Sequence, residues 1–167
     1  MIDIREIRED DAATLFNLLA RVDEETQFML LEPGERKITI EDQRERIKTI
    51  LSRNNQTIFV AENDNDLIGY LAAIGGEFKR NRHRAHIVIG ILQAFINKKI
   101  GTKLFAELEK WTRQHAVHRL ELTVMTHNER AIRLYKKMGF ETEGTKKHSL
   151  LIKGSYVDEY YMAKLIL

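Results

Sequence analysis

One stretch near the middle of the chain limits the fold more than any other feature of the sequence. Residues 86–92 are almost wholly apolar, as expected of a strand that is covered on both faces of its sheet. A few residues later the apolar spacing becomes helical. The residues that share a helical face there are Ile100, Leu104, Leu108 and Trp111. The sequence therefore predicts an α/β chain in which a buried central strand leads through a short loop into a helix.

Two helices are expected ahead of the central strand, after a first strand that carries Ile2, Ile4 and Ile7. Asp10 or Asp11 would cap the first helix. The apolar face of that helix is Leu15, Leu18, Leu19 and Val22. Thr39 and Asp42 have the spacing of a capping box, with aspartate in place of the usual glutamate or glutamine. The second helix, which this box begins, is expected to turn Ile40, Ile47, Ile50 and Leu51 towards the core.

The rest of the pattern completes a mixed sheet. Two short strands separated by a turn precede the central strand, and a strand, a helix and two more strands follow its helix. Apart from the central one, these strands are expected at 57–62, 67–74, 120–124, 140–152 and 156–165. The last helix would begin at Asn128, end at Gly139 and carry Ala131, Leu134, Tyr135 and Met138 on one stripe. We predict a single domain over residues 1–167, α/β in class, with about seven strands and about four helices.

Composition excludes several classes of function. The chain has 167 residues, no cysteine and a net charge of +2. Without cysteine there is no disulfide scaffold, thiolate zinc site or cysteine nucleophile. His83 and His86 would point to opposite faces of a strand, so we expect no metal site. The small net charge argues against general nucleic-acid binding.

The hydropathy pattern gives an expectation for location. No apolar run approaches the roughly 18 residues of a membrane span, and the charged start of the chain does not fit a secretory signal. We therefore expect a cytoplasmic protein with no membrane partner.

The loop that joins the central strand to its helix is the first candidate binding site. Residues 91–104 read Ile-Leu-Gln-Ala-Phe-Ile-Asn-Lys-Lys-Ile-Gly-Thr-Lys-Leu. Backbone amides in such a loop and in the first helical turn lack internal partners, and the helix dipole adds positive potential. The segment therefore suits a phosphate group, to which Lys98 and Lys99 add charge. Many strand–loop–helix connections carry lysines and bind nothing, so this segment does not decide the function by itself.

A second segment, further along the chain, is more specific. Asn128-Glu-Arg-Ala-Ile-Arg-Leu-Tyr-Lys-Lys-Met-Gly-Phe140 reproduces every position of the pattern Asn-x-x-Ala-x-x-Leu-Tyr-x-x-x-Gly-Phe of the Gcn5-related N-acetyltransferase (GNAT) family. The chain resembles this family in its element order as well, from Ile2 to Leu165. The resemblance implies the GNAT acyl-CoA N-acyltransferase fold and acetyl-CoA as co-substrate.

The family's acetyl-CoA pattern, Val-x-x-x-x-Arg/Gln-x-x-Gly-x-Gly/Ala, aligns with Ile91, Ile96, Lys99 and Gly101. Ile96 stands where a side chain usually reaches phosphate, and Lys99 replaces the first glycine. Because the spacing is intact and Gly101 remains, binding through backbone amides is expected to survive. The coenzyme-binding residues that the resemblance implies are Ile91, Leu92, Ile96, Asn97, Lys98, Lys99, Ile100, Gly101, Thr102 and Asn128.

Three of these positions have a specific expected role. The resemblance implies that the amide of Ile91 binds the acetyl carbonyl, as an oxyanion donor would. Asn128 would cap its helix, contact the pantetheine arm, or do both. Lys99 would partly compensate by its charge for the missing glycine.

Tyr135 is the residue that we expect to take part in chemistry. The resemblance implies that it points at the sulfur of coenzyme A. A phenol with a pKa near ~10 can donate a hydrogen bond or a proton to a departing thiolate whose thiol has a pKa near ~8.5. Such general-acid assistance typically contributes about 10²–10⁴-fold. From the helical pattern alone, Tyr135 would be assigned to the apolar stripe with Leu134 and Met138.

No residue stands out as the base that deprotonates the amine. His86, Glu32 and Glu35 are candidates, and so is transfer through water. Glu32 and Glu35, with Glu24 and Glu25, belong to an irregular acidic segment that should border the acceptor site. This segment hints at a cationic acceptor such as a polyamine, lysine or an aminoglycoside, although acidic loops are also common without any such role.

We therefore expect an N-acetyltransferase that moves an acetyl group from acetyl-CoA to a primary amine of a small molecule or protein by direct attack. One alternative is a non-catalytic acyl-CoA-binding regulatory module, which Ile96 and Lys99 favour and Tyr135 opposes. Another is an RNA- or protein-binding module that uses the basic hairpin 79–84, but that segment lacks interleaved aromatic residues. The acceptor and the oligomeric state are left open, with a homodimer common in the family.

Overall fold

One mixed β-sheet carries the fold of this chain, of which the computed structural model describes residues 1–167. The sheet has seven strands in the order β1-β2-β3-β4-β5-β7-β6. Every neighbouring pair is antiparallel except β4 and β5, which are parallel. The strands are β1 (Asp3–Glu6), β2 (Gln56–Asn63), β3 (Asp66–Gly75), β4 (Arg84–Ile91), β5 (Arg119–Met125), β6 (Glu141–Ile152) and β7 (Ser155–Leu165).

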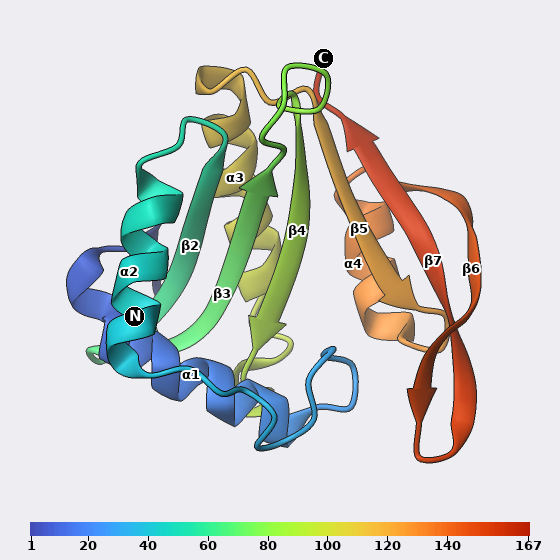
Figure 1. Cartoon of the computed structure of the whole chain (residues 1–167), viewed down its shortest axis with the longest axis horizontal. Helices are drawn as coiled ribbons and strands as arrows, with labels where there is room; N and C mark the ends of the chain where they lie inside the picture. The colour runs from blue at the N-terminus through green and yellow to red at the C-terminus, as the bar shows by residue number, and fades with distance from the viewer.

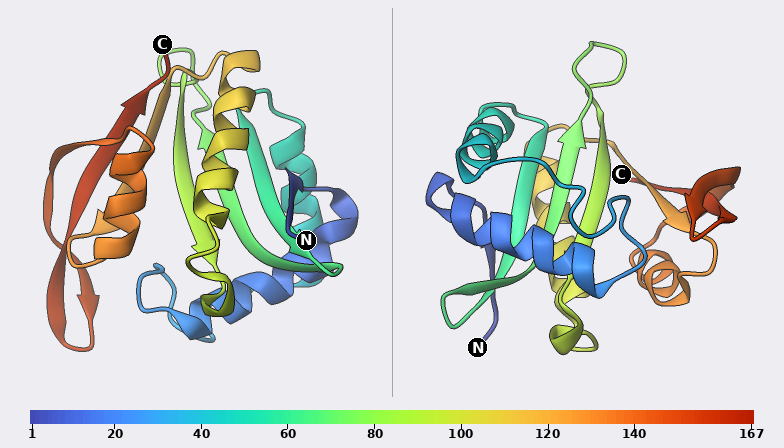
Figure 2. Two further views of the ribbon diagram at one scale, coloured as in Figure 1. Left: turned by 180° about the vertical axis from the view of Figure 1, so that it is seen from behind. Right: turned by 60° about the horizontal axis from the view of Figure 1, so that its bottom comes forward.

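Four α-helices cover the two faces of this sheet. Helices α1 and α2 lie on one face, and α3 and α4 lie on the other (Figure 1; Figure 2). The helices are α1 (Ala12–Glu25), α2 (Ile40–Leu51), α3 (Ile100–Gln114) and α4 (Glu129–Lys137), with short 3-10 turns at Glu9–Asp11 and Gln93–Phe95. The predicted α/β class, mixed sheet and order of elements are confirmed. None of these helices is long and apolar enough to cross a bilayer.

The start of α2 follows the prediction, but its buried face does not. Thr39 Oγ1 accepts a hydrogen bond from the Asp42 amide at 3.0 Å, and the Asp42 carboxylate accepts one from the Thr39 amide at 2.9 Å. The prediction that Ile40 and Leu51 face the core is wrong, since they are 40% and 39% exposed. Ile40 is the first residue of the helix, and Leu51 lies about 100° around the helix from its buried neighbour. The buried stripe consists of Gln43, Ile47 and Ile50.

The predicted cap of α1 is also wrong in its detail. Asp11 precedes the helix, but its side chain makes no capping hydrogen bond to α1. Its carboxylate instead accepts from the Arg5 guanidinium at 2.8 Å and from the Arg8 amide at 2.7 Å. Burial opposes ionisation of Asp11, but these donors outweigh it and keep its pKa below the ordinary value. The predicted apolar face of α1 is buried throughout.

The central strand β4 is not covered on both faces, which corrects the sequence expectation. Ala85 and Ile87 are buried, but His86 is exposed and Val88 and Ile89 are only half-buried. The reason lies in the sheet itself. β4 pairs with β5 only over Arg84–His86 and then diverges from it, so the later part of the strand borders an open gap (Figure 1).

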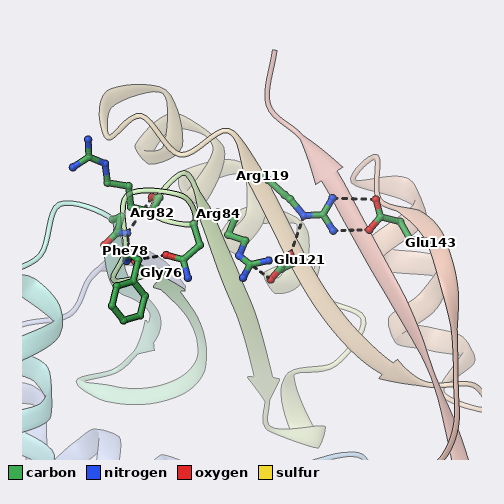
Figure 3. A network of polar contacts seen from close by, with 9 residues as sticks. Gly76, Phe78, Arg82, Arg84, Arg119, Glu121 and Glu143 are labelled. Carbon is green, nitrogen blue, oxygen red and sulfur yellow. Dashed lines mark hydrogen bonds and ion pairs between the residues drawn. The ribbon is translucent and has the colours of Figure 1, made fainter.

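Ion pairs hold β4, β5 and β6 together at the closed end of this gap. Glu121 of β5 accepts a hydrogen bond from Arg119 at 2.8 Å and lies 3.9 Å from Arg84 of β4. Arg119 also binds the Glu143 carboxylate of β6 through both of its terminal nitrogens (Figure 3). The Arg119 guanidinium keeps the pKa of Glu143 below its ordinary value. These ion pairs therefore hold the strands together at the point where β4 and β5 begin to diverge.

The capping box gives a prediction for stability. Thr39→Ala removes the side-chain acceptor for the Asp42 amide, so the free energy of unfolding should fall by about 1 kcal/mol. The matched control is Thr49→Ala in the last turn of the same helix, where alanine has the better helix propensity and stability should stay within about 0.5 kcal/mol. Denaturant melts of both variants measure the difference. Equal stability of the two variants would contradict the capping role.

Candidate active site

A cleft of about 1060 Å³ occupies the gap between β4 and β5. Its walls come from the end of α1 and the segment after it, from β4 and β5, from the first turns of α3 and α4, and from the β6–β7 hairpin. Where β4 and β5 diverge, β4 is hydrogen-bonded only to β3 and β5 only to β7, so each strand is paired along its outer edge alone. Their inner edges face the cleft, so backbone groups there can bind another extended group.

Six consecutive backbone amides lie at the N-terminus of α3, and all but that of Lys98 belong to residues that line the cleft. The N–H groups of residues 97–102 donate to no acceptor in the protein, and the first bond of the turn runs from the Lys103 amide to the Lys99 carbonyl at 3.1 Å. Asn97 and Lys99 have left-handed backbones, with φ of 68° and 62°. Left-handed backbone conformations at alternate residues turn successive amide N–H groups towards a common point, which makes an anion-binding nest at the N-terminus of α3. The Ile96 amide does not belong to this set, because it donates to the Gln93 carbonyl at 3.2 Å.

Cations line the same end of the cleft. Lys99, at the cap of α3, and Arg130 and Arg133 of α4 border the cleft, and Arg133 lies 4.0 Å from the Glu129 carboxylate. Lys98 does not border the cleft, and its ammonium lies 6.0 Å from the centre of the Phe95 ring. The free amides and these three cations together suit a diphosphate group.

Gly101 allows α3 and α4 to approach each other closely at this end. A Cβ atom at Gly101 would lie 2.6 Å from Cδ2 of Leu134, which is shorter than any ordinary contact. The glycine therefore permits Leu134 of α4 to pack directly over the first turn of α3. Because Tyr135 follows Leu134 in the chain, this contact also fixes the helix that carries it.

Tyr135 lies in the core and on the cleft wall at once. Its ring is 7% exposed and packs against Phe105 and Phe140, with centroids 6.0 and 5.9 Å away. Its hydroxyl makes no hydrogen bond within the protein, and the residue lines the cleft. Burial raises the pKa of Tyr135 well above its ordinary value, so the phenol stays protonated across the physiological range. The hydroxyl is therefore a permanent donor.

The remaining residues that the resemblance implies fall into two groups. Ile91, Ile96, Asn97, Ile100 and Thr102 line the cleft. Asn128 lines it too, and its Oδ1 accepts from the Ala131 amide at 3.4 Å, so it also caps α4. Leu92 does not border the cleft, because it is buried and its amide donates to the Ile68 carbonyl at 3.0 Å.

The three candidate bases lie in different places. His86 lines the cleft near its closed end and is exposed. Glu32 and Glu35 line a separate cavity of about 580 Å³ instead. The Glu35 carboxylate accepts from the Glu32 amide at 2.7 Å, so it is engaged in a local turn. Of these three residues, only His86 borders the main cleft.

Glu25, which belongs to the acidic segment predicted to border the acceptor site, is a residue of the main cleft. It is the last residue of α1 and lines both the main cleft and the second cavity. One of its carboxylate oxygens is buried without a hydrogen-bond partner. A carboxylate at the C-terminal end of a helix opposes the helix dipole, which makes this an unfavourable place for an unpaired negative charge.

Comparison with known proteins agrees with this geometry. Residues 16–140 match the Acetyltransferase (GNAT) family. A protein of Escherichia coli (strain K12) named L-amino acid N-acetyltransferase AaaT is 39% identical over 106 residues, which are 61% of this chain and 64% of that protein. The chain thus matches less than two thirds of the length of this relative.

Solved structures share the whole fold. The acetyltransferase of GNAT family from Streptococcus pneumoniae has a TM-score of 0.96, is 32% identical, and each chain covers 100% of the other. Ribosomal-protein-alanine N-acetyltransferase from Brucella melitensis has a TM-score of 0.85 at 24% identity over 98% of this chain and 99% of that one. The structure of yncA from Salmonella typhimurium, solved with its cofactor acetyl-CoA, has a TM-score of 0.87 at 17% identity over 99% of this chain and 94% of that one.

The left-handed backbone at Lys99 gives a prediction for stability. Glycine adopts this conformation without the clash that a Cβ atom causes, so Lys99→Gly should raise the free energy of unfolding by roughly 0.5–1 kcal/mol. Lys98→Gly is the matched control, because Lys98 has no such backbone and glycine there should lower stability instead. Thermal and denaturant melts test the pair. Loss of stability in both variants would mean that Lys99 is not strained.

Proposed function

Because the chain belongs to the GNAT acetyltransferase family, we propose that it transfers an acetyl group from acetyl-CoA to a primary amine by direct attack. The observation that carries the proposal is the arrangement along one cleft of a nest of free amides, two open strand edges and the Tyr135 hydroxyl. These are the elements needed to bind a diphosphate, hold an extended arm and stabilise a thiolate. The cytoplasm is the compartment in which we place this reaction.

Acetyl-CoA would lie with its diphosphate on the amides of residues 97–102. Lys99, Arg130 and Arg133 would neutralise the phosphates, which compensates for the apolar Ile96. The amide groups of the pantetheine arm would pair with the open edges of β4 and β5, as an added strand pairs with a sheet edge. The Ile91 amide would then donate to the acetyl carbonyl.

The reaction needs one bond to form and one to break. The neutral amine attacks the thioester carbon, a C–N bond forms, and the C–S bond then breaks to release the thiolate of coenzyme A. The buried Tyr135 phenol holds its proton more strongly than a thiol does, so it would stabilise this thiolate by donating a hydrogen bond rather than by losing the proton. The proton lost by the amine would pass to His86 or to water in the cleft.

The acceptor would be a primary amine, for which one relative suggests a class. Because the Escherichia coli relative is named as an L-amino acid N-acetyltransferase, we include the α-amine of a free L-amino acid among the proposed acceptors. No covalent intermediate is needed, since both substrates can occupy one continuous cleft.

Coenzyme binding can be tested through the contact of Gly101 with Leu134. Acetyl-CoA should raise the melting temperature of the wild type by mass action. Gly101→Val should abolish this shift, because the added side chain would push α4 away from the first turn of α3. Gly144→Val is the control, since a Cβ atom there meets nothing nearer than 4.0 Å. Calorimetry that finds no binding to the wild type at millimolar acetyl-CoA would contradict the proposed function.

Tyr135→Phe separates a catalyst from a protein that only binds acetyl-CoA. The substitution keeps the packing of the ring and removes the donor, so kcat should fall by roughly 10–10³-fold while the affinity for acetyl-CoA and the melting temperature stay the same. The control is Tyr161→Phe on the exposed side of β7. An unchanged kcat, with chemistry shown to limit the rate, would return Tyr135 to a purely structural role. Absence of turnover in wild type and variant alike would support the non-catalytic module.

A further inference from the structure

Lys146 of β6 is the one lysine that borders the main cleft away from the amide nest. The two lysines that line this cleft are Lys99, at the cap of α3, and Lys146. The Lys146 ammonium makes no ion pair and donates no hydrogen bond within the protein. Its partner on the next strand, Glu159, accepts a hydrogen bond from the Ser149 hydroxyl instead. Lys146 is therefore a free primary amine in the cleft that we propose for acetyl-CoA.

The pairing of the strands fixes the level of Lys146 along the cleft. Lys146 pairs with Glu159 of β7, which in turn pairs with Met125 of β5. Met125 lines the cleft, so this row of residues ends at the gap. Across the gap the row continues to Gly90 of β4, because Met125 and Gly90 each lie four residues beyond the last β4–β5 pair. Gly90 precedes Ile91, whose amide we propose as the donor to the acetyl carbonyl.

The same row shows from which face of the sheet the amine approaches. A Cβ atom at Gly90 would lie 3.0 Å from Cγ1 of Val22, so Gly90 faces α1. Residues of one row share a face, so Lys146 is on the α1 side of the sheet. Tyr135 belongs to α4, which covers the other face (Figure 1; Figure 2). The Lys146 amine and the Tyr135 hydroxyl would therefore meet the thioester from opposite sides.

A bulge in β6 fixes the backbone beside Lys146. The pairing of β6 with β7 shifts between Lys146 and Leu150, and His148 has a left-handed backbone with φ of 48°. The His148 amide donates to the Asp158 carboxylate at 2.8 Å, and the His148 ring stacks on that of Tyr156 with centroids 4.9 Å apart. Bulges re-aim side chains and are frequent next to active sites. Lys146 and Leu150, on either side of this bulge, both line the cleft.

We propose that Lys146 is a self-acetylation site, whose ε-amine takes the acetyl group from bound acetyl-CoA when no external amine is present. The inference rests on the acetyltransferase function proposed above. An amine held beside the thioester reacts at a high effective concentration, which favours Lys146 over lysines elsewhere on the surface. The product is an uncharged acetamide that stays in the cleft and obstructs an external amine. Self-acetylation would thus slow the enzyme when acetyl-CoA is abundant and the amine is scarce.

The step balances without a further co-reactant. The Lys146 ammonium first loses a proton to water, and its neutral nitrogen attacks the thioester carbon. A C–N bond forms, the C–S bond breaks with its electron pair going to sulfur, and the thiolate of coenzyme A leaves. The nitrogen loses its second proton to water. Tyr135 would donate a hydrogen bond to the departing sulfur, as it would for an external amine.

The test incubates the purified protein with acetyl-CoA and no added amine. Peptide mass spectrometry should find Lys146 acetylated about tenfold faster, or more, than any other lysine, and free thiol should appear in a burst of one equivalent per chain. The rate constant of the burst should not change with protein concentration, as expected for transfer within one molecule. Lys146→Arg should abolish the burst, and Tyr135→Phe should slow it by about tenfold or more.

Lys147→Arg is the matched control. Lys147 is exposed beside the site and lines neither the main cleft nor the second cavity. The burst of this variant should match the wild type, and melting curves check that every variant is folded.

One outcome would overturn the inference while leaving the acetyltransferase function intact. It is a wild type that binds acetyl-CoA in calorimetry but acetylates Lys146 no faster than Lys147. A burst rate constant that rises in proportion to protein concentration would mean transfer between molecules, and would also overturn it. Failure of the wild type to bind acetyl-CoA would overturn both the inference and the proposed function.

Discussion

The parallel pairing of β4 with β5 stops after three residues on each strand, and the rest of the site is built around that break. A sheet normally satisfies the backbone groups of its central strands, so an interruption there leaves polar edges that need another partner. The divergence opens a cleft of about 1060 Å³ in the middle of the sheet. The N-terminus of α3 and the C-terminus of α1 border this cleft beside the end of β4, on opposite faces of the sheet (Figure 1; Figure 2). The two helix ends give the cleft opposite potentials.

The surrounding contacts keep the gap at a fixed width. Arg119 and Glu121 tie the closed end together with Arg84 and Glu143 (Figure 3). On the α3 side, the absence of a side chain at Gly101 lets α4 pack closely enough for Tyr135 to reach the cleft wall. On the α1 side, the buried pair of Asp23 and Arg36 anchors the segment over the second cavity. Each wall is therefore held by a contact that does not involve a substrate.

The sequence predicted the class and the order of elements better than it predicted the faces of individual elements. Local chemistry such as the Thr39 capping box could be predicted because its partners are three residues apart. The exposed positions of Ile40 and Leu51 could not, since they depend on which side of α2 meets the sheet. Apolar content suggested that β4 is covered on both faces, but apolar residues also line a binding cleft. The sequence placed Glu25 in the segment expected to border the acceptor site, but its position between two cavities could not be predicted because it depends on contacts distant in sequence.

Amide hydrogen exchange with and without saturating acetyl-CoA tests most directly whether the gap between β4 and β5 is the coenzyme site. The free amides of residues 97–102 and the open edge of β4 at 87–91 should exchange more slowly when the coenzyme is bound, because it would accept their hydrogen bonds. The basic hairpin at 79–84, which lies outside the cleft, should exchange at the same rate in both states. Unchanged exchange at 87–102, in a sample that calorimetry shows to have bound acetyl-CoA, would contradict this account.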